Sequence, residues 1–286
     1  ILRLGARDTI LSVEMQTETT VVAAARGLPA RMFVYVNRND YGYGVVLLDD
    51  RSRGWLLTNR VNVADPFLRA MLWGSLWDLV REARLDPRRF LQAALPALLA
   101  ERDEQIAARL MGRIARVVDR LSADDAEARE RIEESLLRGA TDAARSYGLR
   151  KNFFDTYVSV ARSPRALVRL NAWLDSSTAA GGPLRQPTRW SIVTWLVARG
   201  SPTGEGRLLA ETARDSTPGG RRRAFIAGAG FADPTVKRTY FTRFFADSTL
   251  NEDWVTSSLG AFNDPAQSDL TPHGVKVTVL DKKQIE

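Results

Sequence analysis

The sequence predicts a mainly α-helical chain, an irregular α-solenoid of HEAT- or armadillo-like helix pairs, preceded by a small β-sandwich portion. The residues before position 48 alternate polar and apolar side chains, as half-buried strands do. After position 65, apolar residues recur at helical spacing. Helix-start signals then return about every 15–25 residues, so a helix pair takes roughly 40, as in HEAT and armadillo units. We expect the β portion at 1–48, the helical domain at 49–271, and at 272–286 a tail that abandons the helical pattern.

Short extended runs predict the strands of the first region. Thr9–Met15 alternates polar and apolar residues, and Thr19–Val22 is β-branched. Arg31–Val36 and Gly42–Leu48 are two further runs, separated by the turn-forming residues Asn37–Asp40. Because so few strands are not stable alone, we expect this portion to rest on the helices that follow.

Six dipeptides predict helix starts in the second region. In each, a side-chain oxygen can cap free backbone amides while proline occupies the first helical position, where it needs no N–H donor. The dipeptides are Asp65-Pro66, Asp86-Pro87, Ser163-Pro164, Thr217-Pro218, Asp233-Pro234 and Asp264-Pro265. Apolar periodicity predicts helices at 68–80, 106–121, 88–100, 125–147, 152–162, 164–175, 189–199, 204–214, 218–229, 234–246 and 251–260. Ser176–Pro183 has the composition of a loop, read as a long connection or a hinge between subdomains.

Composition and charge exclude several classes of function. The net charge is +7, but the 41 basic residues are interleaved with 34 acidic ones, so we expect a mixed-charge surface and no nucleic-acid partner. No apolar run reaches the roughly 18 residues of a membrane span. The absence of cysteine excludes disulfides. The compartment is left undetermined, with the cytoplasm weakly favoured.

The scarcity of metal ligands excludes a catalytic zinc site built from this chain. Such a site needs three protein ligands, mostly His, Cys and carboxylate, and the chain has one histidine, His273. A helical H-E-x-x-H pair cannot be formed from one histidine. We therefore expect no catalytic, metal-binding or cofactor-binding residues here, and an inactive chain whose chemistry lies elsewhere.

One residue is a candidate for binding a peptide. Arg189 lies just inside a predicted helix, beside Trp190, and arginine can hold a carboxylate bidentately. The structural alternative is a salt bridge within the fold. Trp73 and Trp77, four residues apart, are expected to pack in the core.

Two other pairs are assigned to packing and to the surface. Tyr41 and Tyr43 are expected to pack between the two regions, with substrate contact as the lesser alternative. Glu133-Glu134 is expected to lie on an exposed helix face.

Several segments, in order, resemble the C-terminal half of the M1 family of zinc aminopeptidases, in its aminopeptidase N-like bacterial branch. The first resembles the junction between the family's last sandwich strand and its helical domain, and the others resemble successive helices. They are Asn37–Asp49, Asp65–Asp78, Asp103–Ile114, Thr188–Val193, Asp233–Lys237, Leu250–Trp254 and Phe262–Pro265. The family's metal-binding helix and its G-x-M-E-N motif have no match in the chain, and Arg189 matches no motif.

The resemblance implies a non-catalytic C-terminal domain of a zinc metallo-aminopeptidase. Its partners would be an N-terminal catalytic domain of the same polypeptide, which would carry the zinc, and the peptide substrate. The helices would enclose the active-site cavity and limit peptide access. The alternative is a free-standing α-solenoid that binds another protein, and a weaker third interpretation is a basic helical repeat that binds DNA.

Overall fold

The structure is a computed structural model that describes residues 2–4, 7–15, 17–28, 33–121, 125–180 and 182–270. Within these ranges the chain is mainly α-helical, as predicted. It divides into two compact units, Ile1–Val117 and Val118–Glu286. The domain limits predicted from the sequence stay a prediction, and the tail at 272–286 lies outside the described residues.

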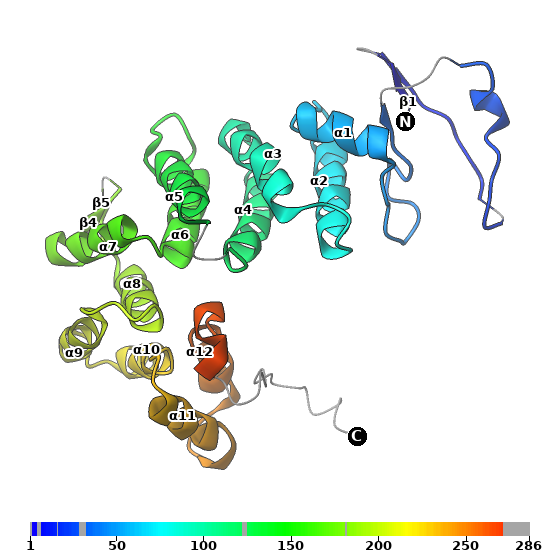
Figure 1. Cartoon of the computed structure of the whole chain (residues 1–286). Helices are drawn as coiled ribbons and strands as arrows, with labels where there is room; N and C mark the ends of the chain where they lie inside the picture. The colour runs from blue at the N-terminus through cyan, green and yellow to red at the C-terminus, as the bar shows by residue number, and fades with distance from the viewer. Residues whose placement is uncertain are drawn as a thin grey trace. The chain divides into compact units, whose positions relative to one another are not determined.

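The first unit begins with a three-stranded antiparallel sheet in the order β2-β1-β3 (Figure 1). Its strands are β1 (Leu2–Leu4), β2 (Arg7–Thr9) and β3 (Phe33–Val34). Leu2 pairs with both Thr9 and Val34.

The strands expected at 19–22 and 42–48 are not strands, and that expected at 9–15 is reduced to Thr9. A short 3₁₀ helix, η1 (Ala23–Ala25), follows the run predicted at 19–22. Isolated extended runs form a sheet only where a neighbour completes their hydrogen bonds, and the described residues supply none here.

The described residues of the first unit also form the helices α1 (Asp50–Thr58), α2 (Pro66–Arg81), α3 (Pro87–Ala100) and α4 (Glu104–Val118), whose last residue belongs to the second unit. Helix α1 was not predicted, because its apolar residues are few. It is held to the sheet by Ser52, whose Oγ accepts a 2.9 Å hydrogen bond from the Val34 amide. The Phe33 ring stacks on Trp55 at 5.3 Å, and Trp73 and Trp77 pack edge-on against Phe90, which confirms their place in the core.

The described residues of the second unit form eight α-helices and a short hairpin. The helices are α5 (Ala126–Thr141), α6 (Tyr147–Val160), α7 (Pro164–Ser176), α8 (Gln186–Ala198), α9 (Gly204–Arg214), α10 (Pro218–Gly228), α11 (Pro234–Ala246) and α12 (Glu252–Phe262). Strands β4 (Thr178–Ala179) and β5 (Gly182–Pro183) lie in the predicted loop, and a 3₁₀ segment, η3 (Pro265–Leu270), ends the described chain.

Helices of this unit pack mostly against their near neighbours in sequence, as in helical-repeat proteins. Helix α5 packs on α6, α8 on α9 and α10, and α10 on α12. The α5–α6 approach depends on Gly139, where a Cβ would lie 2.2 Å from the Phe153 ring. An aromatic cluster built on Phe225, Tyr240, Phe244 and Phe262 closes the C-terminal end.

All six predicted helix starts are confirmed. The capping residue precedes an α-helix in five cases and the η3 segment in the sixth. In each of the five α-helices the capping oxygen accepts from a backbone amide of the first turn, as the sequence pattern requires.

Candidate functional site

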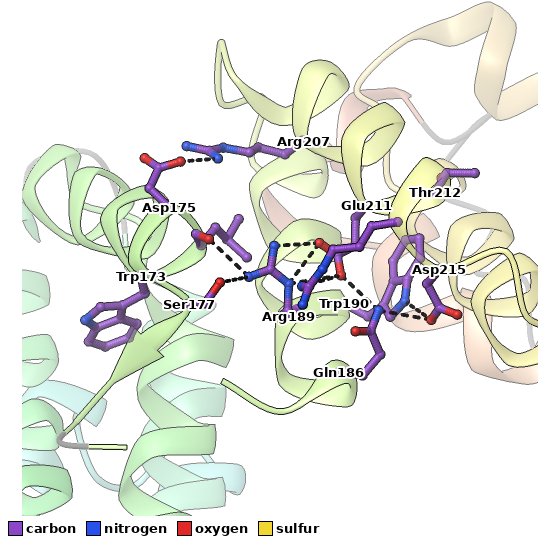
Figure 2. Close-up of polar contacts among 12 residues, drawn as sticks. Trp173, Asp175, Ser177, Gln186, Arg189, Trp190, Arg207, Glu211, Thr212 and Asp215 are labelled. Atoms are coloured by element: carbon purple, nitrogen blue, oxygen red, sulfur yellow. Dashed lines mark hydrogen bonds and ion pairs between the residues drawn. The ribbon is translucent and has the colours of Figure 1, made fainter. Parts of the chain in front are cut away.

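The predicted site residue Arg189 lies in the first turns of α8 and points toward α9 (Figure 2). Its side chain is 10 % exposed and that of its partner, Glu211, is 3 % exposed. Arg189 Nε donates to both Glu211 oxygens at 3.0 Å, and Nη2 donates to Oε2 at 2.8 Å. The pair is therefore a buried, multidentate salt bridge that joins the two helices.

The remaining guanidinium nitrogen of Arg189 binds the preceding segment. Nη1 donates to the Leu174 carbonyl at 3.0 Å, near the end of α7, and to Ser177 Oγ at 3.1 Å. The Ser177 backbone is left-handed, with φ of 55°, which places its hydroxyl there. All three nitrogens are thus engaged inside the unit.

This arrangement is the salt-bridge alternative that the sequence left open. Contact between Arg189 and a peptide carboxylate stays a prediction, and it would require that carboxylate to displace Glu211.

A second buried acid, Asp215, extends the network (Figure 2). Its Oδ2 accepts from the indole of Trp190 at 2.8 Å and from the Gln186 amide at 3.1 Å, while Thr217 donates to Oδ1 at 2.6 Å. The Thr217 hydroxyl, followed by the Trp190 indole, lowers the pKa of Asp215 to about 2. Asp215 is therefore a fixed anion at neutral pH, unsuited to proton transfer.

Neither Glu211 nor Asp215 was singled out from the sequence. Glu211 lies in α9, and Asp215 caps the C-terminal end of that helix. Their spacing of four residues, about one helical turn, places both carboxylates on the same side. An acid pair at this spacing after an arginine-bearing helix is the signal that was available, but it is shared by many exposed helix faces.

Two predicted roles are wrong. Tyr41 and Tyr43 do not pack between regions: both are almost fully exposed, on a loop in which Asn37 and Asp40 have left-handed backbones. Hydrogen bonds that the Asn37 side chain makes with Gly42 close this loop and turn both rings outward.

Glu133 is not on an exposed face but is buried. It accepts from the amides of Arg162 at 2.7 Å and Ser163 at 3.0 Å, and also from the Ser163 hydroxyl. A carboxylate that satisfies amides at the start of a neighbouring helix, here α7, is stable without water.

The described residues do not form a metal site. No group of three or more His, Cys, Asp or Glu side chains in this part of the chain could hold a metal ion. His273 lies outside the described residues. The helices that the structure describes also include none long and apolar enough to cross a bilayer.

The fold and its buried polar network define a class: a mainly α domain of paired helices, tied together by internal salt bridges. Residues 33–274 match the family described as the ERAP1-like C-terminal domain, and the chain belongs to that family. It is also similar to Aminopeptidase N of Streptomyces lividans, with 28 % identity over 232 residues, covering 80 % of this chain and 27 % of the relative. The chain is thus the C-terminal region of an M1-family aminopeptidase, as the sequence resemblance indicated.

Proposed function

We propose that the helices of this chain enclose the active-site cavity of an M1 zinc aminopeptidase and limit which peptides reach it. The observation that carries the proposal is the family match over residues 33–274. The chain spans only about a quarter (27 %) of the length of the relative it matches. In this proposal, the rest of such a protein supplies the catalytic machinery. That machinery would hold the zinc and release N-terminal residues with a zinc-bound water.

The surface of the first unit supports a partner from the same polypeptide. Strands β2 and β3 each have one neighbour among the described residues, which leaves two sheet edges open. Seven large apolar side chains nearby are at least 43 % exposed: Ile10, Val13, Met15, Val21, Val36, Val45 and Leu47. So many exposed apolar side chains between positions 10 and 47 support a surface that another part of the protein covers.

The first test asks where the chemistry resides. The chain alone should bind no stoichiometric zinc in elemental analysis and should release no fluorophore from an aminoacyl reporter. Zinc bound one to one, or turnover that follows the purified chain through chromatography, would contradict the proposal.

The second test asks whether the helices restrict access. The whole polypeptide should cleave short peptides faster than long ones, and a version lacking 49–270 should lose this length preference while it keeps its zinc and cleaves the reporter. Identical length dependence in both versions would contradict the enclosing role. A polypeptide without a zinc-binding H-E-x-x-H before Ile1 would instead favour a free-standing protein-binding scaffold.

A further inference from the structure

A cavity of about 660 Å³ lies within the first unit, of the size that small ligands occupy. One face of α2, one face of α4 and the loop before α1 line it. The lining changes in character along the two helices. Apolar side chains of their first turns, Phe67, Met71 and Ile106, give way to the guanidinium groups of Arg109 and Arg113 one and two turns later on α4.

Arg113 is the unusual group in this cavity. It is half-buried, and no hydrogen bond or ion pair joins it to the part of the chain that the structure describes. Its Nη2 reaches the α2 backbone at Gly74, where an added Cβ would lie 3.8 Å away. Burial lowers the pKa of Arg113 to about 10, with Arg109 and Arg116 acting in the same direction against Asp78. The group therefore stays charged at neutral pH, and this half-buried cation is open to an anion that enters the cavity.

The acids that line the cavity are occupied elsewhere. Asp103 Oδ1 accepts from the amides of Gln105 and Ile106, both at 2.9 Å. Asp40 accepts from Asn37 at 3.2 Å, and Asp78 pairs with Arg81 at 3.4 Å. Asp78 still acts on Arg113 through space, so the cavity suits an anion of one charge better than one of two.

We propose that this cavity binds a small monocarboxylate with an apolar chain or ring. Arg113, with Arg109 one turn before it, holds the carboxylate, because a guanidinium matches its two oxygens. The apolar body lies against Phe67, Met71 and Ile106. Arg189, whose three nitrogens already have partners, is a separate group in the other unit.

The test is calorimetric titration of the whole chain with hexanoate, compared with hexanol, hexylamine, acetate and inorganic phosphate. Hexanoate should bind at one site, at least tenfold more tightly than each of the others. Arg113→Met should weaken hexanoate binding at least tenfold, and Met71→Glu, which places an acid at the apolar end, should do the same with Arg113 intact. Arg116→Met, an exposed arginine on the same helix, is the matched control and should bind as the unaltered chain does.

Four outcomes would overturn the proposal. Equal binding of phosphate and hexanoate would mean an adventitious ion only, and equal binding of hexanol would remove the role of charge. An Arg113→Met chain that keeps its helical circular dichroism and its affinity would remove the role of that residue. A Met71→Glu chain with unchanged affinity would place the ligand elsewhere.

Discussion

Arg69 in the first unit and Arg189 in the second occupy equivalent places in their helices. The glutamates that they bind differ in their other hydrogen-bond partners. Each is the fourth residue of its helix, and each binds a glutamate beyond that helix and backbone carbonyls before it. Arg69 donates to Glu101 at 2.8 and 3.0 Å and to the Val63 carbonyl at 2.7 Å. Glu101 also accepts from two backbone amides, whereas Glu211 depends on side chains alone.

A basic residue at the fourth helical position also occurs in other helices of the chain. Basic residues fill 41 of 286 positions, so chance would place about two at the fourth position of twelve helices. Eight of the α-helices that the structure describes have one there: Arg53, Arg69, Arg129, Arg150, Arg189, Arg207, Arg221 and Lys237. The helix dipole disfavours a cation near a helix N-terminus, so another interaction must account for this recurrence.

That interaction is with backbone carbonyls outside the helix. Six of the eight basic side chains donate to one: Arg53 to Arg84, Arg69 to Val63 and Ala64, Arg129 to Leu121, Arg189 to Leu174, Arg221 to Ser216, and Lys237 to Ala229 and Phe262. A cation here satisfies carbonyls at the ends of other helices and in turns, before or after it in the sequence. Both units therefore use a basic residue at the fourth helical position to bind backbone carbonyls. They differ in which other groups stabilise the acid that this residue binds.

The largest effect should come from breaking the pair whose acid accepts from side chains and from no backbone amide. Arg189→Met leaves Glu211 charged and buried, and loss of one member of a buried pair costs about 3–5 kcal/mol. Urea unfolding followed by circular dichroism should show this loss. Replacing both residues, as Arg189→Met with Glu211→Leu, should restore much of it, because no buried charge is left alone. A single variant as stable as the unaltered chain would contradict this account.

Arg69→Met should cost less, about 1.5–3 kcal/mol, the range for hydrogen bonds to charged groups. Burial would raise the pKa of Glu101, but Arg69 and the amides of Asp103 and Arg102 outweigh it and hold that pKa below its usual value. This contribution to stability is present above the unfolded-state pKa and is lost as pH falls through the folded one. The variant's deficit, measured by urea unfolding from neutral to acidic pH, should therefore shrink toward low pH. A deficit that stays constant would contradict the assignment.

Much of this architecture could be predicted from local sequence. The oxygen–proline starts were found because capping and proline geometry are properties of neighbouring residues. Three of those starts also carry the basic residue three positions after proline, at Arg69, Arg221 and Lys237, a signal that was present but not used.

What could not be predicted depends on contacts between distant residues. Pairing of Arg189 with Glu211 joins two helices, and only the fold decides whether an arginine meets an internal acid or a ligand. The strands predicted at 19–22 and 42–48 did not form for the same reason. An extended run needs a neighbouring strand, and the local sequence does not show which segment that would be. Burial of Glu133 likewise depends on the start of α7 lying beside it.

Lys237 is also the fourth residue of its helix, α11, but it binds carbonyls and no acid is bonded to it. It is 1 % exposed, and its Nζ donates to the carbonyls of Ala229 and Phe262 and lies 4.8 Å from the Phe262 ring centre. Burial lowers its pKa to about 8, against the weaker opposing effect of Asp264. The unfolded chain, with a lysine pKa of 10.5, therefore binds more protons between these values.

The contribution of Lys237 to the free energy of unfolding is therefore highest above pH 10.5, the lysine pKa of the unfolded chain. It falls as the pH drops toward about 8, the pKa of Lys237 in the folded chain. From pH about 7.5 to about 9.5, the unaltered chain should gain about 2 kcal/mol relative to Lys237→Met. Urea unfolding of both chains across this window measures the gain. Parallel curves for the two chains would mean that Lys237 does not titrate there.

The smallest effect should come from a basic residue that is not at the fourth helical position. Lys151 lies one residue after Arg150 in α6 and pairs with Asp155 across one helical turn, with both side chains about half exposed. Exposed pairs of this kind contribute about 0.3–0.5 kcal/mol, and salt screens them. Lys151→Ala should therefore cost at most that amount in urea unfolding, and the difference should vanish in high salt. A loss as large as that of Arg69→Met would show that position in the helix does not decide what a basic residue contributes.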